Sequence, residues 1–535
     1  MPLRKGKVLE WFPAGITDSY DSTFTFQGAC TSLSNLVFDQ GNPEAVISRP
    51  GVTVLTSFPG FTTPGFVSLH VTVGPLVYGF IASGLNVGFD QPFCFNTTTG
   101  AFVTLTGVTS GNVPTSPPTS GAWVPPSAAV IGTYLILTHP GYSGTGTNFF
   151  GVINLSTNAY STSNLGTHAL PSVPTSVANF NNRAYFAIAN QTYYSDSLSP
   201  LVSTNAGQIL TFGDTSPVTA MSGLPVTTST AGVIQALIVF KTGQIWQVTG
   251  DPALSGNPIA ETYLSLSQGT SSPRSVCQTT RGTFFIGTDG PMIVDSLGNV
   301  RALTNQNSPI SDLRLPFINV TVPSRVEGDY ASNVYRVCVP TVIQGNNVTN
   351  DYWFDVNKGR WNGPHSFPYD CSSAIGNSFI LSSSSAPGKL FSSYPNPNPS
   401  TVYTDNGVAL TTSLQSSAFP MSGDMDEYCI MESVIELASA GASVQYTISL
   451  QDTLNDVLST AVVTTTQQGA LWGSFVWGRG TWSTSVRIPN DFIIPWPGPV
   501  VSDKFLLNIS ASSSNSLFIG ALQARAQPVG YTLRS

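Results

Sequence analysis

Few residues of this chain have types and spacings that could organise side-chain chemistry. The four histidines, His70, His139, His168 and His365, lie far apart and lack the spacings of zinc sites, so each is expected to be a turn or core residue. No GxSxG, Walker A or helix-opening GxGxxG motif is present. The cysteines occur singly, without a CxxC pair, which is typical of buried thiols in a reducing compartment. We therefore predict no catalytic residue, no cofactor and no enzymatic activity.

One acidic cluster is the only candidate metal site. Asp424, Asp426 and Glu427 stand close together, and hard cations bind several carboxylates in one loop. A solvated loop before a strand is the interpretation that we favour, so we expect no bound metal. A glycosidase would need two paired carboxylates, and the separation that defines such a pair cannot be read from sequence.

Tryptophans gather near the C-terminal end of the sequence, at Trp472, Trp477, Trp482 and Trp496. Their spacing suits neighbouring strands, and packing in a core or interface is the first interpretation. A sugar-stacking platform is the alternative.

Charge is scarce and unevenly distributed. Charged residues make up 9% of the 535 residues, with a formal net charge of −8. Residues 50–182 contain no Lys or Arg, and Asp90 is their only carboxylate. Strong DNA binding needs clustered cations, so this composition argues against it and suits assembly through uncharged polar surfaces. No uninterrupted apolar run approaches 18 residues, so we expect no membrane segment.

The elements that would carry any site are short strands. From about residue 66 to 394, apolar runs alternate with Gly, Asn, Asp and Ser clusters. Three segments, FNTTTGAF, VDSLGNV and FDVNKGRW, predict the same hairpin. We expect Asn or Asp to supply a residue that tolerates the left-handed conformation, and Gly to supply the positive φ that a tight hairpin requires. A unit of roughly 40 to 55 residues is typical of propeller blades and predicts about six to eight of them. A pair of β-sandwiches is the alternative.

The final part of the chain has a different pattern, with antiparallel strand candidates such as 429–439, 443–452 and 504–510. We predict an all-β protein: a β-propeller plus a C-terminal antiparallel β-sandwich, or platform, domain. Residues 1–52 would form an N-terminal arm and strands that join the platform, 53–398 the propeller-like domain, and 399–535 the sandwich. The N-terminal segment has no apolar stretch of a secretory signal, so we expect synthesis in the cytoplasm.

A turn motif precedes the repeats. Arg49-Pro50-Gly51 reads as a type II turn, with positive φ at Gly51, and the earlier Asn35 belongs to the same turn-rich stretch. Arg49 is the last cation before the uncharged segment. We expect a local carboxylate, Asp39 or Glu44, or turn carbonyls to hold it in a structural role.

Four short features carry a resemblance to a known family: Asn35, Arg49-Pro50-Gly51-Val52, the Asp355-Val356…Gly359-Arg360-Trp361 hairpin and Gly-Ala-Leu at 520–522. In these features the chain resembles the tail nozzle proteins of short-tailed bacteriophages, also called tail tubular protein B. The resemblance implies a structural virion protein. Its copies would form a ring, usually a hexamer, below the portal and adaptor rings, with tail fibres or spikes as further neighbours. Genome DNA would pass through the ring without sequence-specific binding. Two alternatives stay open, a receptor-binding or carbohydrate-binding β protein and a propeller glycosidase.

Overall fold

The structure is a computed structural model. It describes residues 7–18, 28–42, 44–59, 67–82, 88–116, 123–228, 232–251, 258–303, 313–343, 346–398, 401–419, 427–440, 443–465 and 489–529. Within these ranges almost all regular structure is β, and the helices are the single turns η1 (Pro273–Ser275), α1 (Leu315–Ile318) and η2 (Pro323–Arg325). None of these helices has the length and apolar character needed to cross a membrane.

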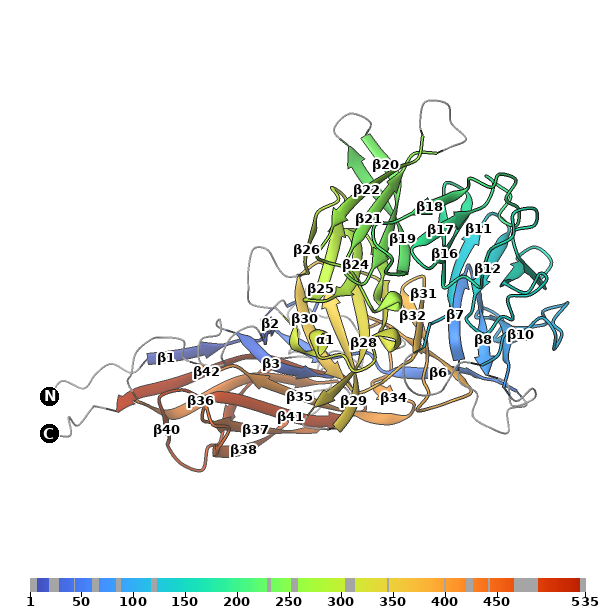
Figure 1. Cartoon of the computed structure of the whole chain (residues 1–535). Helices are drawn as coiled ribbons and strands as arrows, with labels where there is room; N and C mark the ends of the chain where they lie inside the picture. Colours follow the sequence, from blue (N-terminus) through green and yellow to red (C-terminus); the bar gives the residue numbers. More distant parts are fainter. Residues whose placement is uncertain are drawn as a thin grey trace.

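Five four-stranded antiparallel sheets follow one another along the chain and form blades 1 to 5 of a propeller (Figure 1). Blade 1 is β7 (Val67–Val73), β8 (Leu76–Ala82), β9 (Asp90–Asn96) and β10 (Ala101–Val103); blade 2 is β11 (Ser127–Ile131), β12 (Tyr134–Thr138), β13 (Phe150–Asn154) and β14 (Ala159–Ser163). Blade 3 is β15 (Ser176–Phe180), β16 (Arg183–Ile188), β17 (Gln191–Tyr194) and β18 (Ile209–Thr211); blade 4 is β19 (Val218–Thr228), β20 (Gly232–Lys241), β21 (Ile245–Thr249) and β22 (Ala260–Ser265). Blade 5 is β23 (Cys277–Thr279), β24 (Gly282–Gly287), β25 (Gly290–Asp295) and β26 (Val300–Ala302).

Two further blades close the ring. Blade 6 is β27 (Glu327–Ala331), β28 (Val334–Ile343), β29 (Asn346–Asp355) and β30 (Arg360–His365), and blade 7 has β31 (Cys371–Ile375), β32 (Ser378–Ser382) and β33 (Lys389–Ser393). The outer strand of blade 7 is β6 (Val52–Ser57), which comes from before blade 1 and pairs antiparallel with β33. The first strand of each blade lies beside the first strand of the next, and β31 returns to β7. The propeller therefore has seven blades, within the predicted range.

Apolar side chains between neighbouring blades hold the ring together. Separate buried clusters fill the interfaces of blades 1 and 2, 2 and 3, 3 and 4, 4 and 5, and 7 and 1. The fold class predicted from the short apolar runs is confirmed.

The predicted turn chemistry is confirmed for glycine, whereas the left-handed role expected of Asn and Asp is wrong, since Asn96, Asp295 and Asp355 are not among the described residues with positive φ. Asn96, Asp295 and Asp355 each accept hydrogen bonds on Oδ1 from two backbone N–H groups of their own turn. The glycines that end these turns have positive φ, 67° at Gly100, 81° at Gly298 and 64° at Gly359. Three unrelated stretches thus share one hairpin because the same two residue types satisfy its backbone.

Two more sheets pack into a sandwich beside the propeller (Figure 1). The first contains β39 (Asn490–Ile494), β40 (Val500–Ser502), β36 (Glu427–Ser439), β42 (Leu517–Val529), β1 (Lys7–Trp11), β5 (Val46–Ser48) and β4 (Leu36–Phe38). The second contains β38 (Val457–Thr465), β37 (Val444–Gln451), β41 (Leu506–Ser513), β35 (Val408–Ser416), β3 (Ala29–Ser34) and β2 (Gly15–Ile16).

Strands from both ends of the chain build the sandwich. β1 pairs antiparallel with β42, and β3 pairs antiparallel with β35. Alternation along β37 places Tyr446, Ile448 and Leu450 in the core. The short strand β34 (Thr404–Asp405) bridges β35 and β6, and β3 contacts β30 at Leu33 and Gly363. The second sheet is therefore continuous with blades 6 and 7.

Candidate functional site

The inner strands of the propeller line a cavity of about 530 Å³. His70 of β7, Glu327 of β27 and Ser372 of β31 contribute to its wall, together with Arg274 of η1. Trp123 lies at the same cavity, on the connection between blades 1 and 2, and its ring stacks under the Arg325 guanidinium at 5.3 Å. The Trp123 side chain is buried.

Arg274 ties several blades together around this cavity. Its guanidinium forms an ion pair with Glu327, and Nη2 donates hydrogen bonds to the Asp370 carbonyl (2.6 Å) and to Cys371 Sγ (2.8 Å). Its Nη1 also donates to the Ser68 carbonyl, at 3.3 Å. The connection before blade 5 is thereby fixed to blades 6, 7 and 1.

Burial disfavours the charged forms of two titratable groups at the cavity, His70 and Cys371. Burial, and then the charge of Arg274, lower the pKa of His70 to about 3. Burial raises the pKa of the Cys371 thiol to about 12, against the opposing effect of Arg274. At neutral pH the imidazole is uncharged and the thiol keeps its proton. These two residues therefore supply no activated nucleophile.

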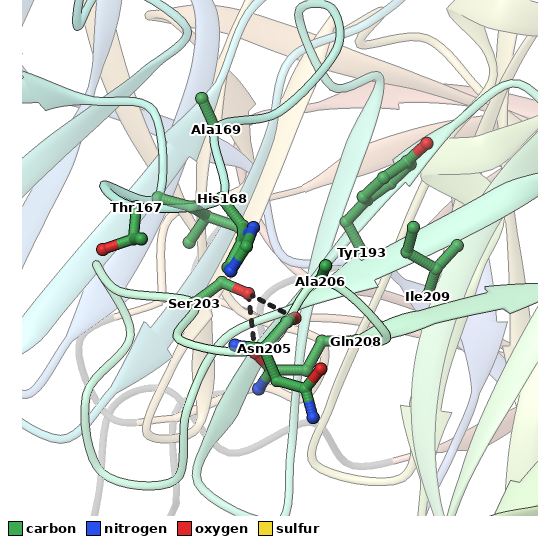
Figure 2. A pocket seen from close by; sticks show the side chains of 10 residues that line it. Thr167, His168, Ala169, Tyr193, Ser203, Asn205, Ala206, Gln208 and Ile209 are labelled. Atoms are coloured by element: carbon green, nitrogen blue, oxygen red, sulfur yellow. Dashed lines mark hydrogen bonds between the residues drawn. The ribbon is translucent and has the colours of Figure 1, made fainter.

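A second hollow, of about 310 Å³, lies on blade 3 (Figure 2). It is bounded by the connection from β14 to β15 and by the segment between β17 and β18. His168, the one histidine of the four that is not buried, stands in its wall.

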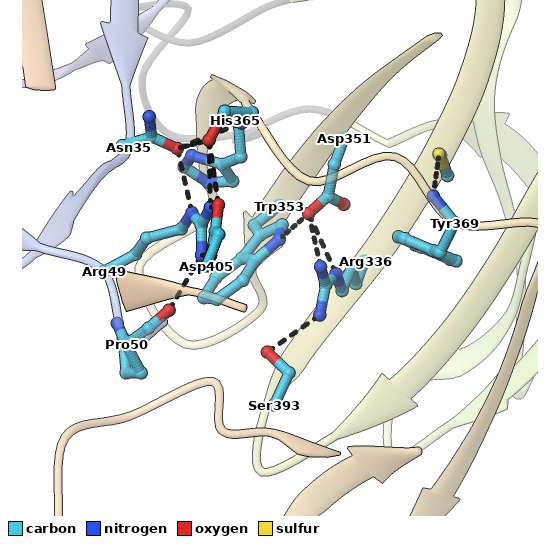
Figure 3. A network of polar contacts seen from close by, with 12 residues as sticks. Asn35, Arg49, Pro50, Arg336, Asp351, Trp353, His365, Tyr369, Ser393 and Asp405 are labelled. Atoms are coloured by element: carbon cyan, nitrogen blue, oxygen red, sulfur yellow. Dashed lines mark hydrogen bonds and ion pairs between the residues drawn. The ribbon is translucent and has the colours of Figure 1, made fainter. Parts of the chain in front are cut away.

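The turn residues singled out in the sequence meet at the junction of the propeller and the sandwich (Figure 3). Asn35 has a left-handed backbone, φ 54°, between β3 and β4, a conformation that asparagine tolerates better than most residues. Its Oδ1 accepts hydrogen bonds from Arg49 Nε and from the Ser366 backbone N–H, both at 3.0 Å. Its Nδ2 donates to the Thr411 carbonyl at 2.8 Å. One side chain thus connects the turn to blade 6 and to β35.

Arg49 is fully buried, and its carboxylate partner is Asp405 of β34, at 2.5 Å. The prediction that Asp39 or Glu44 is the carboxylate that holds Arg49 is wrong. The chain folds so that a carboxylate 356 positions away lies nearer than those of the local turn. The expectation that a turn carbonyl also holds Arg49 is confirmed, since Nη1 donates to the Pro50 carbonyl at 2.9 Å.

The reason for glycine at position 51 also differs from the prediction. Gly51 is absent from the residues with positive φ in the described part of the chain, so the type II turn is wrong. A Cβ at Gly51 would stand 2.2 Å from the Thr404 carbonyl oxygen. Glycine is required here because the backbone of β34 comes too close for any side chain.

A second buried cation lies next to this junction. Arg336 of β28 pairs with Asp351 of β29 at 2.8 Å, and Trp353 Nε1 donates to the same carboxylate oxygen at 2.8 Å. The guanidinium also faces the ring of Tyr369, 4.6 Å from its centroid. Burial, then the charges of Arg49 and Arg336, hold the pKa of His365 well below its ordinary value. His365 is therefore neutral next to the two buried cations.

Several other predicted candidates fall outside the structure's ranges. Asp424 and Asp426 lie outside the described residues, and Glu427 is exposed at the start of β36. Within the described ranges, no three His, Cys, Asp or Glu side chains are grouped to hold a metal ion. Of the four C-terminal tryptophans only Trp496 is described, and it is partly buried, donating to Ser433 Oγ at 3.0 Å.

The cavity residues His70, Arg274 and Glu327 were not identified from the sequence. They are separated by more than 50 positions from one another and belong to no motif. Only the closure of the ring brings them together. Histidine at the end of an apolar run in the first blade was the one available signal.

No protein-family model matches the chain, and no curated protein sequence matches it. Among solved structures, the chain is similar to the WD40 β-propeller domain of Doa1, with a TM-score of 0.34 and 10% identity over 64% of this chain and 97% of that one. It is similar to the β-propeller domain of the Trilobed protease from Pyrococcus furiosus, with a TM-score of 0.33 and 9% identity over 62% and 94%. It is also similar to a puromycin-hydrolyzing peptidase from Mycobacterium tuberculosis, with a TM-score of 0.36 and 10% identity over 70% and 61%. These likenesses concern the fold alone.

Proposed function

We propose that this chain is a structural protein of a bacteriophage virion, a tail nozzle subunit. Its copies would assemble into a ring, with six the expected number, below the portal and adaptor proteins. The ring would serve as a conduit and gate for genome DNA during ejection, in contact with DNA that passes without sequence-specific binding. Tail fibres or spikes would be its outer neighbours.

The observation that carries this proposal is the set of exposed aliphatic side chains on the sandwich. Scattered apolar residues are normal on a surface, but exposed aliphatic side chains on several strands of one domain offer apolar area for a protein interface. These residues lie on β1, β35, β38, β39, β40, β42 and the turn before β38. They are Val8, Val408, Leu454, Val457, Leu458, Val462, Ile493, Val501 and Val529.

The charge distribution supports the same proposal. Asp90, the only carboxylate in residues 50–182, is buried and accepts a hydrogen bond from Ser68 Oγ at 2.5 Å, with His139 Nε2 at 3.1 Å. Its charge is therefore not displayed on the surface of blades 1 and 2. A wall without clustered cations lets DNA slide, because few counterions are displaced by contact with it.

The test compares ring assembly of the wild type with that of variants in which exposed aliphatic side chains of the sandwich are replaced. Purified chain, alone and mixed with portal and adaptor proteins from the same genome, is measured by mass photometry and negative-stain imaging. We expect closed rings or collars for the wild type. Val462→Lys and Ile493→Lys place a charge at side chains that are 51% and 66% exposed, and should leave folded single subunits.

The matched control is Leu297→Lys in the last turn of blade 5, where the leucine is 66% exposed but lies on the propeller. This variant should assemble as the wild type does. A chain that stays monomeric with the connector proteins present, or rings that survive both sandwich variants, would contradict the proposal.

A further inference from the structure

The hollow on blade 3 has two different walls and a polar floor. Figure 2 shows Thr167 and His168 on one side and the Tyr193 ring with Ile209 on the other. Ser203, Asn205 and Gln208 lie between them at the base. An aromatic and aliphatic wall thus faces a wall of hydrogen-bonding groups across about 310 Å³.

The floor is held rigid by bonds within blade 3. Gln208 is buried; its Oε1 accepts hydrogen bonds from Ser203 Oγ at 2.6 Å and from the Asn205 N–H at 3.0 Å. Its Nε2 donates to Asp196 Oδ1 at 2.9 Å. Leu165 is held in a left-handed conformation, φ 70°, with its carbonyl bonded to the Ser203 N–H at 3.0 Å. A pocket whose walls are fixed before binding loses little entropy when it is occupied.

Other polar groups at the hollow are not used by the fold. Within the described part of the chain, the His168 imidazole, the Thr167 hydroxyl and the Asn205 Nδ2 group make no hydrogen bond. Tyr193 is fixed differently, because its hydroxyl donates to Gln191 Oε1 at 2.9 Å and so orients the ring. The available groups are a hydroxyl and an imidazole, which both donate and accept, and an amide donor.

The lining carries no Lys, Arg, Asp or Glu. The nearest carboxylate partner of the floor, Asp196, has its Oδ1 occupied by Gln208 Nε2 and by the Thr204 N–H at 3.3 Å. Phosphates, carboxylates and ammonium groups would be desolvated here without a charged partner. The occupant must be neutral, rich in hydroxyl groups and apolar on one face.

We propose that this hollow binds one neutral sugar residue of a glycan. The apolar face of a pyranose would pack on Tyr193 and Ile209, and its hydroxyl groups would bond Thr167, His168 and Asn205. The inference does not depend on ring assembly, because every residue involved belongs to one subunit.

The experiment is saturation-transfer NMR and calorimetric titration of the full chain with the methyl glycosides of glucose, galactose, mannose and N-acetylglucosamine. We expect at least one to bind with a Kd of about 1 mM. Tyr193→Ala, which removes the aromatic wall, should weaken binding about tenfold or more. Ala206→Trp fills the hollow from an exposed position and should abolish binding without disturbing the core.

The matched control is Tyr263→Ala, which removes a tyrosine that is 59% exposed on blade 4. It should leave sugar binding unchanged. The proposal is overturned if none of the four glycosides binds, if binding survives Ala206→Trp, or if glucuronate or inorganic phosphate binds more tightly than every neutral sugar.

Discussion

At the scale of single residues, the chain buries three of its scarce cations. Arg49, Arg336 and Lys241 have fully buried side chains, and each contacts a carboxylate on a different strand or turn. Lys and Arg are rarely buried unless they are paired. Because these three cations are buried, the outer surface carries less positive charge than the composition indicates.

The Arg49–Asp405 pair should couple the turn to β34. Breaking a buried pair leaves an unpaired charge, so Arg49→Met and Asp405→Asn should each lower the free energy of unfolding by about 3 kcal/mol. The double variant should lose less than the sum, with a coupling energy of about 1–3 kcal/mol. Urea denaturation of the four proteins measures this cycle.

The control cycle uses Arg525 and Glu432, an exposed pair at 3.6 Å on the sandwich. Arg525→Met and Glu432→Gln should show a coupling energy below about 1 kcal/mol. Equal coupling in the two cycles would contradict a structural role for the junction pair.

Asp329, on the inner strand of blade 6, should make stability depend on pH. Burial raises its pKa from 3.8 to about 6. As pH rises from about 4 to 6, the unfolded chain releases this proton while the folded chain keeps it, so stability falls across that window. Asp329→Asn should be more stable than the wild type at pH 7, by on the order of 1–3 kcal/mol.

Urea denaturation at pH 4, 5, 6 and 7 measures the difference. The two proteins should be similar at pH 4, where the carboxyl is largely protonated in the folded state. A difference that stays constant over all four values would show that the proton on Asp329 is not involved.

Sequence reasoning at this scale succeeded with local chemistry. The Asn and Asp turn caps were predictable because their partners lie within four residues. Asp405 was not predictable as the partner of Arg49, because only the closed fold brings β34 beside the turn.

At the scale of elements, β34 lies so close to the Arg49–Gly51 turn that the residue at position 51 has no room for a side chain. Gly51→Ala should lower the free energy of unfolding by about 3 kcal/mol, since the added methyl group meets the Thr404 backbone and one strand must move. Gly243→Ala is the control, with nothing within 4 Å of the added Cβ and no positive φ. It should change stability by about 0.5 kcal/mol or less, as judged by denaturation.

At the scale of the whole molecule, assembly should tolerate salt. Blades 1 and 2 present no cation and no exposed carboxylate, and the nine sandwich residues proposed for the interface are aliphatic. Contacts made by such surfaces are not screened. Rings should therefore keep their mass from 0.05 to about 1 M NaCl in mass photometry, whereas dissociation as salt rises would indicate an interface built on ion pairs.

The blade range and the propeller class could be predicted from repeated hairpins, because each blade is a local structure. The number seven could not, since blade 7 takes its outer strand from residues that precede blade 1. The sugar-sized hollow was also invisible in the sequence. His168 belongs to the connection before blade 3 and Tyr193 belongs to β17, and only the packing of that connection on the blade brings them together.

The pairing of β1 with β42 and of β6 with β33 affects when the chain can finish folding during its synthesis. A ribosome makes β6 some 330 positions before β33, and β1 about 500 positions before β42. At roughly 5–20 residues per second, the first strands wait about 17–100 s for their partners. The middle blades can form during translation, but the propeller and the sandwich close only after β33 and β42 have been made and can pair with β6 and β1. A stalled or shortened chain would keep its N-terminal strands exposed, as a handle for chaperones or for degradation.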